Sequence, residues 1–296
     1  MRLRAGETTY ELTRPWLMGV VNANDDSFSD AGRYSGLDAK VARAAELLEA
    51  GADLIDIGGE SGITNRPETA VQEEIARVVP LIARVVGELG ALVSVDTYKP
   101  AVAEAAVAAG ASIVNDVSGL RDPELASICA RTGAGLVLMH TRAAPKVRMQ
   151  DPGAYDDVVA DVAGFLRERM ELAVARGVDP EQIVLDPGPD FAKTPAQTIA
   201  VLRRLDVLAE LGRPILLAVS RKDFIGAVTG RPPGARGPGT LAALGEGFDA
   251  GAHIARVHDV AAARDYLAVR EVLRGAADVA EGLALADAIR HERPSG

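Results

Sequence analysis

Short apolar runs alternate with longer amphipathic segments along most of this 296-residue chain. Within 37–51, Val41, Ala44, Ala45 and Leu48 fall at positions i, i+3, i+4 and i+7, which is the spacing of one helix face. The runs between such segments are apolar at nearly every position, as expected of strands buried on both sides in a parallel sheet. They lie at residues 16–21, 54–57, 92–95, 113–114, 136–139, 183–185, 215–219 and 254–257. The pattern predicts about eight strands alternating with helices.

Glycines mark where the predicted helices end. A glycine closes the helical segment before each run after the first, where a left-handed backbone can stop a helix. These are Gly51, Gly90, Gly110, Gly133, Gly177, Gly212 and Gly251. The number of predicted strands and the length of the chain are typical of an α/β fold, the single-domain (β/α)8 TIM barrel. We place the barrel at 16–275, an N-terminal segment at 1–15, and a C-terminal helix and tail at 276–296. An open doubly wound sheet is the alternative, but no GxGxxG follows the first run.

Composition narrows the range of partners. With 32 basic and 42 acidic residues the net charge is −10, which argues against a nucleic-acid partner but leaves room for a local basic pocket. The single cysteine, Cys129, excludes an internal disulfide and a multi-cysteine zinc site, and we expect it in the core. The sequence shows neither a signal-peptide core nor the ~20 consecutive apolar residues of a membrane helix. We therefore expect a cytoplasmic protein that acts on small molecules and has no membrane partner.

Polar side chains follow almost every predicted strand. They are Asn22, Asp56, Glu60, Asp96, Asn115, Asp116, His140, Asp186, Lys222, Arg256 and His258. In a (β/α)8 barrel the carboxyl ends of the strands form the active-site face. Any one of these residues alone is explained by helix capping or by a loop hydrogen bond. A circle of such polar side chains is costly to bury unless a polar ligand lies at its centre. Together they therefore predict a ligand-binding site at the open end of the barrel, which we call the mouth.

The residue types indicate what the ligand is. One group offers acceptors and amide donors suited to the edge of a flat heterocycle such as a pterin or purine: Asp96, Asn115 and Asp186. A second group consists of donors and cations on the last two strands, where barrels commonly bind phosphate: Lys222, Arg256 and His258. No HxH or HExxH pair indicates a zinc hydrolase, and no GxSxG indicates acyl transfer. The mouth is predicted to hold a ring at one end and an anion at the other.

Seven stretches of the chain, in order and over roughly 16–273, resemble the dihydropteroate synthase family. They read LMGVVNANDDSFSD, GADLIDIGGES, VSVDTYKPAVAEAA, AGASIVNDVSG, DPGPDFAKT, SRKDFIG and GAHIARVHDV. The resemblance implies a (β/α)8 barrel that is a transferase of folate biosynthesis and forms a homodimer. Such an enzyme joins 6-hydroxymethyl-7,8-dihydropterin pyrophosphate to p-aminobenzoate or a related amine. Pyrophosphate is released with the assistance of Mg²⁺.

The resemblance also implies roles for individual residues. For the pterin ring it implies Asp96, Asn115, Asp186 and Lys222, with Met139 and Phe191 as apolar flanks. For the pyrophosphate it implies Asn22, Arg256 and His258, with Asn22 also a ligand of Mg²⁺. The implied catalytic residues are Lys222, Arg256 and Asp30. The amine-side loops carry Phe28, Arg66, Pro67 and Asp223, and the loops after the first two strands would close to exclude water.

Departures from the family pattern gather on the amine side of the site. The family has serine where this chain has Asp223, and there the serine and its backbone amide help to bind the carboxylate of p-aminobenzoate. Asp223 would repel that carboxylate, or would cap the following helix instead. Asn24 and Asp25 replace a Thr-Pro pair, and Pro189 and Asp190 replace an aliphatic residue and a glycine. The sequence therefore predicts weak binding of p-aminobenzoate and an altered preference for the amine.

A pterin-binding barrel without synthase activity is the alternative to a synthase. Examples are a methyltransfer domain that acts on a methylated folate, and a partner-binding paralogue. A methyltransfer domain needs no pyrophosphate clamp, so the presence of Arg256 together with His258 favours the synthase.

Overall fold

The structure is a parallel β-barrel surrounded by helices. A computed structural model describes residues 1–24, 36–62, 64, 67–286 and 289–290. Within these residues, eight parallel strands form one sheet in the order β8-β7-β6-β5-β4-β3-β10-β9. A parallel bridge between Leu185 and Ile215 joins the two ends of this order, and the Leu185 amide donates to the Pro214 carbonyl oxygen at 2.9 Å. The predicted (β/α)8 barrel is confirmed.

The strands coincide with the apolar runs of the sequence. Their bounds are β3 Trp16–Asn22, β4 Leu54–Gly58, β5 Val93–Asp96, β6 Ile113–Asp116, β7 Gly135–Met139, β8 Ile183–Asp186, β9 Leu216–Leu217 and β10 Ile254–Val257. Every residue of β4, β6, β7 and β8 is buried, which is why these strands read as continuous apolar runs rather than as alternating patterns.

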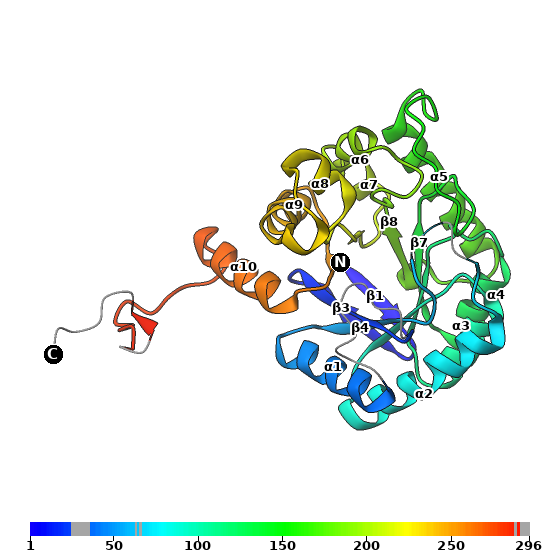
Figure 1. Cartoon of the computed structure of the whole chain (residues 1–296), viewed down its shortest axis with the longest axis horizontal. Coiled ribbons are helices and arrows are strands. Elements are labelled where there is room, and N and C mark those ends of the chain that lie inside the picture. The colour runs from blue at the N-terminus through cyan, green and yellow to red at the C-terminus, as the bar shows by residue number, and fades with distance from the viewer. Residues whose placement is uncertain (25–35, 63, 65–66, 287–288, 291–296) are drawn as a thin grey trace.

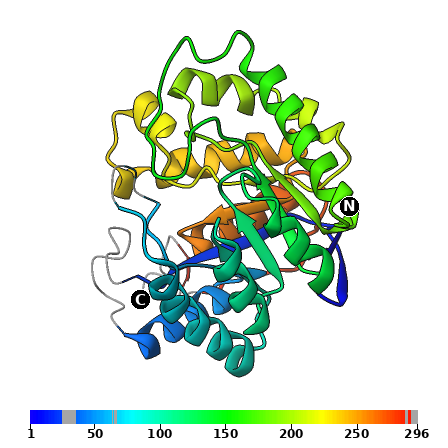
Figure 2. The same cartoon turned by 90° about the vertical axis from the view of Figure 1, so that its right-hand side faces the viewer.

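The helices form a layer outside the barrel (Figures 1 and 2). Their bounds are α1 Leu37–Glu49, α2 Val71–Leu89, α3 Pro100–Ala108, α4 Glu124–Thr132, α5 Val158–Ala175, α6 Pro195–Leu202, α7 Asp206–Ala209, α8 Asp223–Thr229, α9 Gly237–Asp249 and α10 Val260–Leu273. All seven glycines predicted to end helices have positive φ; Gly90 and Gly133, for example, are the left-handed C-caps of α2 and α4. Cys129 is buried, as predicted.

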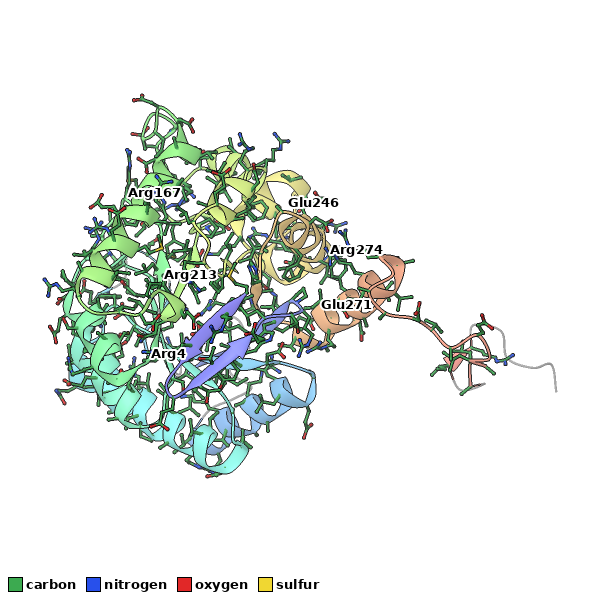
Figure 3. All side chains as sticks on the ribbon, turned by 180° about the vertical axis from the view of Figure 1, so that it is seen from behind. Arg4, Arg167, Arg213, Glu246, Glu271 and Arg274 are labelled. Atoms are coloured by element: carbon green, nitrogen blue, oxygen red, sulfur yellow. The ribbon has the colours of Figure 1, made fainter. Side chains whose placement is uncertain are left out.

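A hairpin that the apolar pattern did not reveal covers the amino-terminal end of the barrel. It consists of β1 (Arg2–Ala5) and β2 (Thr8–Glu11), and it lies across the barrel in the view from behind (Figure 3). Leu3 is fully buried and belongs to the apolar cluster inside the barrel, with Met18 and Val184 among its members. Arg4 donates to Asp179 at 3.1 Å and to Gln182 at 2.9 Å, which ties the hairpin to the start of β8. The segment predicted only as an N-terminal extension therefore closes the bottom of the core.

The C-terminal region beyond α10 is exposed. In the described residues 274–286 and 289–290 there is no α-helix, whereas a helix and tail were expected at 276–296. Figure 1 shows the chain running away from the barrel after α10. None of the described helices combines the length and the apolarity that a membrane crossing requires.

Removing the side chain that closes the bottom of the core should be costly. We expect Leu3→Ala to lower the free energy of unfolding by about 2–5 kcal/mol, because it leaves a cavity beneath the hairpin. Thr9→Ala, on the exposed face of β2, is the control and should change it by no more than about 0.5 kcal/mol. Urea unfolding followed by circular dichroism measures both, and a loss below about 1 kcal/mol for Leu3→Ala would contradict the packing described.

Candidate active site

Four side chains from β4, β5, β6 and β10 are connected by hydrogen bonds at the carboxyl end of the barrel. The Arg256 guanidinium donates from Nε to Oδ2 of Asp56 at 2.7 Å and from Nη2 to Oδ2 of Asp96 at 3.0 Å. The Asn115 side-chain amide approaches both oxygens of Asp56, at 3.3 and 3.4 Å. Strand register explains the proximity, because Asp96 of β5 lies directly beside Asn115 of β6. We call these four residues the polar floor.

Burial controls the ionisation of the polar floor. It raises the pKa of Asp96 to about 7, although the charge of Arg256 acts in the opposite direction. Burial also acts to lower the pKa of Arg256, but the attraction of Asp56 and Asp96 is stronger and raises it overall. Arg256 is thus a fixed cation, while the charge of Asp96 is sensitive to pH near neutrality.

A second group of predicted residues comes from the ends of β7, β8 and β9. Asp186 is almost fully buried, and its Oδ1 accepts a hydrogen bond from the Gly188 amide at 2.7 Å. Burial raises its pKa to about 6, against the attraction of Lys222. The Lys222 amino group lies 4.2 Å from the centre of the Phe191 ring, and Met139 is buried at the end of β7. The structure therefore places the Lys222 amino group against the Phe191 ring, and Asp186 and Met139 at the ends of the neighbouring strands β8 and β7.

His258 lies at the end of β10, next to a hollow of about 210 Å³. Arg43 and Glu46 of α1, Arg221 of the loop after β9, Asp259 and the first residues of α10 line the same hollow. The Nδ1 of His258 is 2.9 Å from the Ser220 hydroxyl, which also accepts from the His258 amide at 3.3 Å. Burial lowers the pKa of His258 to about 3, and the charges of Arg256 and Arg221 act in the same direction. His258 is therefore a neutral hydrogen-bonding group, a donor rather than a cation within the predicted group of donors and cations.

Other predicted residues are placed only in part. Asn22 ends β3, is half-buried and has Gly58 as its register partner in β4. Pro67 is exposed. Phe28, Asp30 and Arg66 lie outside the described residues. Among the residues that are described, no cluster of three or more His, Cys, Asp or Glu side chains has the geometry of a metal site.

Comparison with known proteins identifies the family. The model of the pterin binding enzymes matches residues 18–258. The dihydropteroate synthase of Bacillus subtilis (strain 168) is 45% identical over 245 residues, which cover 82% of this chain and 83% of that protein. The chain belongs to the dihydropteroate synthase family. The resemblance seen in the sequence is confirmed, and the chain is a transferase of this family.

Solved structures of another synthase agree with this assignment. The Xanthomonas albilineans dihydropteroate synthase with 4-aminobenzoic acid is 42% identical and has a TM-score of 0.85. The same enzyme in complex with 7,8-dihydropteroate has a TM-score of 0.83. Each comparison covers 93% of this chain and 99% of the other. The fold of this chain is thus that of the synthase family.

The amine side of this synthase differs from the expectation drawn from its sequence. The Asp223 carboxylate is 65% exposed at its side chain and pairs with Arg236 at 2.9 Å. A different carboxylate caps α8: Oδ2 of Asp190 accepts from the Asp223 amide at 2.6 Å and from the Phe224 amide at 3.3 Å. Asp223 is therefore neither the cap of α8 nor an unpaired charge, and the carboxylate bound to its amide is that of Asp190.

Three strand-end residues do not join the site of this synthase. Glu60 pairs with Lys99 at 2.5 Å and with Lys146 at 2.9 Å. Asp116 accepts from the amides that follow it along the chain, those of Ser118 and Leu120. His140 is fully buried and hydrogen-bonded to Lys193 and Asp161. For these residues the capping or loop explanation is correct.

Sequence reasoning missed the contributions of Arg43, Ser220 and Asp190. Arg43 belongs to the exposed pattern of an ordinary helix, and Ser220 ends an apolar run, so neither carries a local signal. Asp190 did carry one, because it stands where the family has glycine. Its role needed the structure, since its partner amide lies 33 residues further along the chain.

Proposed function

We propose that this synthase joins 6-hydroxymethyl-7,8-dihydropterin pyrophosphate to p-aminobenzoate or a related amine and releases pyrophosphate in folate biosynthesis. The observation that carries the proposal is the polar floor, in which the Arg256 guanidinium binds the carboxylates of both Asp56 and Asp96. Support comes from relatives, because the Xanthomonas albilineans synthase has been solved with 4-aminobenzoic acid and with 7,8-dihydropteroate.

The pterin ring would lie over the polar floor. Asp186 and Asp96 would accept hydrogen bonds from the N–H groups of its guanidine-like edge, and the Asn115 amide would complete the edge. Phe191 and Met139 would flank the ring on its apolar faces. The predominance of buried acceptors at this end matches a heterocycle that presents several donors.

The reaction is a displacement at the methylene carbon attached to the ring. The bond from this carbon to the pyrophosphate oxygen breaks and its electron pair leaves with the pyrophosphate; the amine nitrogen forms the new bond and then loses a proton. Negative charge therefore grows on the leaving group, where Arg256 and a neutral His258 N–H would stabilise it. Arg221 and Arg43, which line the hollow beside His258, would extend the anion end. Lys222 would act at the ring, next to Phe191.

Magnesium fits the donor set on the pyrophosphate side. Mg²⁺ commonly takes one or two protein oxygens and completes its coordination with substrate phosphates and water, so a dedicated cage of carboxylates is not required. Asn22 at the end of β3 would supply the protein oxygen. When bound there, the ion would offset charge on the departing pyrophosphate. Asp30, Phe28 and Arg66 remain predictions from the family resemblance.

An assay of pyrophosphate release with a panel of aromatic amines tests the proposed function. We expect release to require both the pterin substrate and an amine, and chelation of Mg²⁺ to slow it at least about tenfold. Asn22→Ala should raise the Mg²⁺ concentration that gives half-maximal rate. Release that is indifferent to every amine would contradict the synthase, and an unchanged rate after chelation would contradict the role of the metal.

The titration of Asp186 gives a second prediction. Ionised Asp186 accepts from the ring, and because its pKa is about 6 the ionised form is present above that pH and is lost as the pH falls through it. Lowering the pH from 7 to 5 should therefore weaken binding of a pterin about tenfold in the wild type. In Asp186→Asn, binding at pH 7 should be about ten- to hundredfold weaker, and the pH step should be about tenfold smaller than in the wild type, since only Asp96 still titrates in this range.

Calorimetry of a pterin at both pH values measures this difference. The titration of Asp96 is common to wild type and variant, so the comparison isolates Asp186. If pterin affinity changed equally with pH in the two proteins, Asp186 would not be a pterin-binding residue.

Asp190 should weaken the binding of an amine that carries a carboxylate. The family resemblance assigns the backbone amide of residue 223 to the carboxylate of p-aminobenzoate, and in this chain the Asp190 carboxylate already accepts from that amide at 2.6 Å. Two like charges about 4 Å apart repel by about 1 kcal/mol in water and about 4 kcal/mol at an effective dielectric of 20. A neutral or cationic amine avoids this repulsion.

We therefore expect Asp190→Gly to lower the KM for p-aminobenzoate by at least about fivefold. Glycine also suits the backbone, since φ of Asp190 is 64°. Asp223→Ser is the matched control and should change KM by about threefold or less, because its exposed charge is already paired with Arg236. Steady-state kinetics decide the matter; wild-type saturation at low micromolar p-aminobenzoate, with no gain in Asp190→Gly, would refute the prediction.

We also propose a cytoplasmic homodimer that associates through the outer helices near the C-terminus. The support is apolar exposure on α10, where Val269, Val272 and Leu273 are 61%, 36% and 81% exposed. Light scattering at micromolar concentration should give twice the chain mass of 30.9 kDa. A monomeric mass would refute the dimer.

A further inference from the structure

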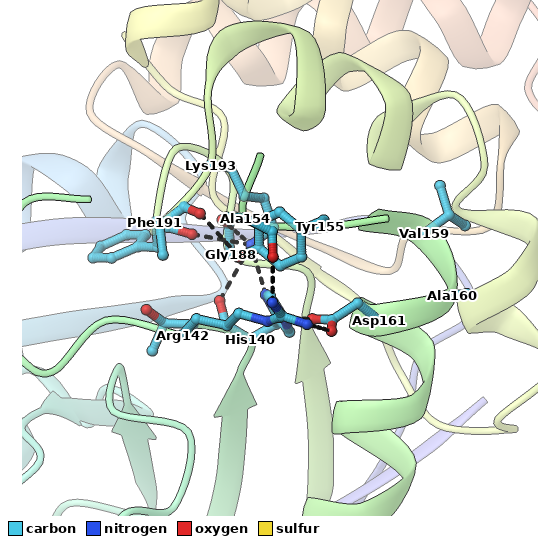
Figure 4. Close-up of polar contacts among 12 residues, drawn as sticks. His140, Arg142, Ala154, Tyr155, Val159, Ala160, Asp161, Gly188, Phe191 and Lys193 are labelled. Atoms are coloured by element: carbon cyan, nitrogen blue, oxygen red, sulfur yellow. Dashed lines mark hydrogen bonds and ion pairs between the residues drawn. The ribbon is translucent and has the colours of Figure 1, made fainter. Parts of the chain in front are cut away.

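Lys193 is a fully buried lysine beside the proposed pterin end. Its amino group lies 2.7 Å from Nδ1 of His140, 3.0 Å from the Gly188 carbonyl oxygen and 3.1 Å from the Phe191 carbonyl oxygen (Figure 4). The His140 carbonyl oxygen is a more distant fourth contact, at 3.4 Å. An ammonium group has three N–H donors, so each has a close acceptor. Burial lowers the pKa of Lys193 to about 7, and the three acceptors offset part of the cost of burying its charge, so that Lys193 is a three-way anchor.

The hydrogen-bonding direction of this cluster is fixed by its ends. The Nε2 of His140 lies 3.0 Å from Oδ1 of Asp161, whose carboxylate also pairs with Arg142. A carboxylate only accepts, so His140 holds its proton on Nε2, and Nδ1 of the neutral ring accepts from Lys193. Burial lowers the pKa of His140 to about 3, which agrees with a neutral ring. The order Lys193 to His140 to Asp161 connects the loop after β8 with the end of β7 and with α5.

The loop that Lys193 anchors has an unfavourable backbone. Asp190 and Ala192 have φ values of 64° and 51°, a region that residues other than glycine adopt at a cost. Two groups hold the loop in this shape: Lys193 binds the carbonyl oxygens of Gly188 and Phe191, and Tyr155 donates to that of Ala192 at 2.9 Å. Without such anchors this segment would relax to ordinary backbone angles.

The same loop contacts two side chains of the proposed pterin end, those of Asp186 and Lys222. The Gly188 amide donates to Asp186, and the Phe191 ring lies 4.2 Å from the Lys222 amino group. We propose that Lys193 is a positioning residue of this synthase, which ties the loop between β8 and α6 to the end of β7 and so fixes Phe191 against Lys222. The proposal rests on the proposed function for its ligand. Lys193 itself is enclosed by protein and touches no substrate in this role.

The test compares two buried polar residues at opposite ends of β8. Lys193→Met keeps the chain length and removes all three donors. Gln182→Met is the matched control: Gln182 is also fully buried, and its amide donates to the carbonyl oxygens of Cys129 and Ala134 at the bottom of the barrel, far from the mouth. Both variants should lose stability, so a general effect of destabilisation appears in both.

Positioning predicts a difference between the two variants that a loss of stability alone would not produce. In Lys193→Met the Kd for a pterin should rise about tenfold, and the KM for the amine should change as well, because Asp190 lies in the same loop. In Gln182→Met both constants should stay within about twofold of wild type. Unchanged pterin affinity in Lys193→Met, or an equal rise in Gln182→Met, would overturn the proposal.

Two further measurements keep the test decisive. Amide exchange of residues 188–192 needs no ligand and should accelerate in Lys193→Met but not in Gln182→Met; unchanged exchange would overturn the anchoring. If the wild type binds no pterin, the proposed function is refuted. The amide exchange rates would still show whether Lys193 holds the loop in place. If Lys193→Met does not fold, Lys193→Gln takes its place, because glutamine retains two N–H donors. Its pterin Kd and amide exchange should then lie between those of the wild type and those expected for Lys193→Met.

Discussion

The ion pairing of Arg256 with Asp56 and Asp96 is the interaction on which the site depends. A barrel mouth that binds a donor-rich ring must bury several acceptors close together, and buried carboxylates repel one another. A single guanidinium between two of them, at 2.7 and 3.0 Å, balances this charge and also fixes the direction of both side chains. Asp56 then orients Asn115, so the whole polar floor follows from where β10 places one arginine.

The loop after β8 connects the two ends of the proposed reaction. Lys193 anchors it to β7, and this fixes Phe191 on the pterin side. Asp190 of the same loop caps α8 and occupies the Asp223 amide on the amine side. A change of sequence in this short segment can therefore alter the acceptor amine without disturbing the polar floor. This separation explains how the chain keeps the residues proposed for the ring and the pyrophosphate while it departs from its family on the amine side.

Much of the fold was predictable because its signals are local. Doubly buried strands give continuous apolar runs, and helix ends need residues that accept positive φ, so the runs and the glycines located β3 to β10. The β1–β2 hairpin was missed because its alternating, half-exposed residues carry no such run. Within the site, the rule that polar residues follow the strands found Asp96, Asn115 and Arg256. It failed for His140, Glu60 and Asp116, since the strand end fixes the position of a residue but not the direction of its side chain. The cap supplied by Asp190 depends on a contact between distant segments, which no local pattern encodes.

The most direct test of the role of Arg256 is the binding of a pterin to Arg256→Gln, measured by calorimetry in the absence of pyrophosphate. If Arg256 organises the polar floor, its loss leaves Asp56 and Asp96 without their shared partner, and the Kd for the pterin should rise at least about tenfold. An arginine that acted only on the departing pyrophosphate would leave this Kd at the wild-type value while turnover fell. That result would contradict the organising role of Arg256 in the polar floor.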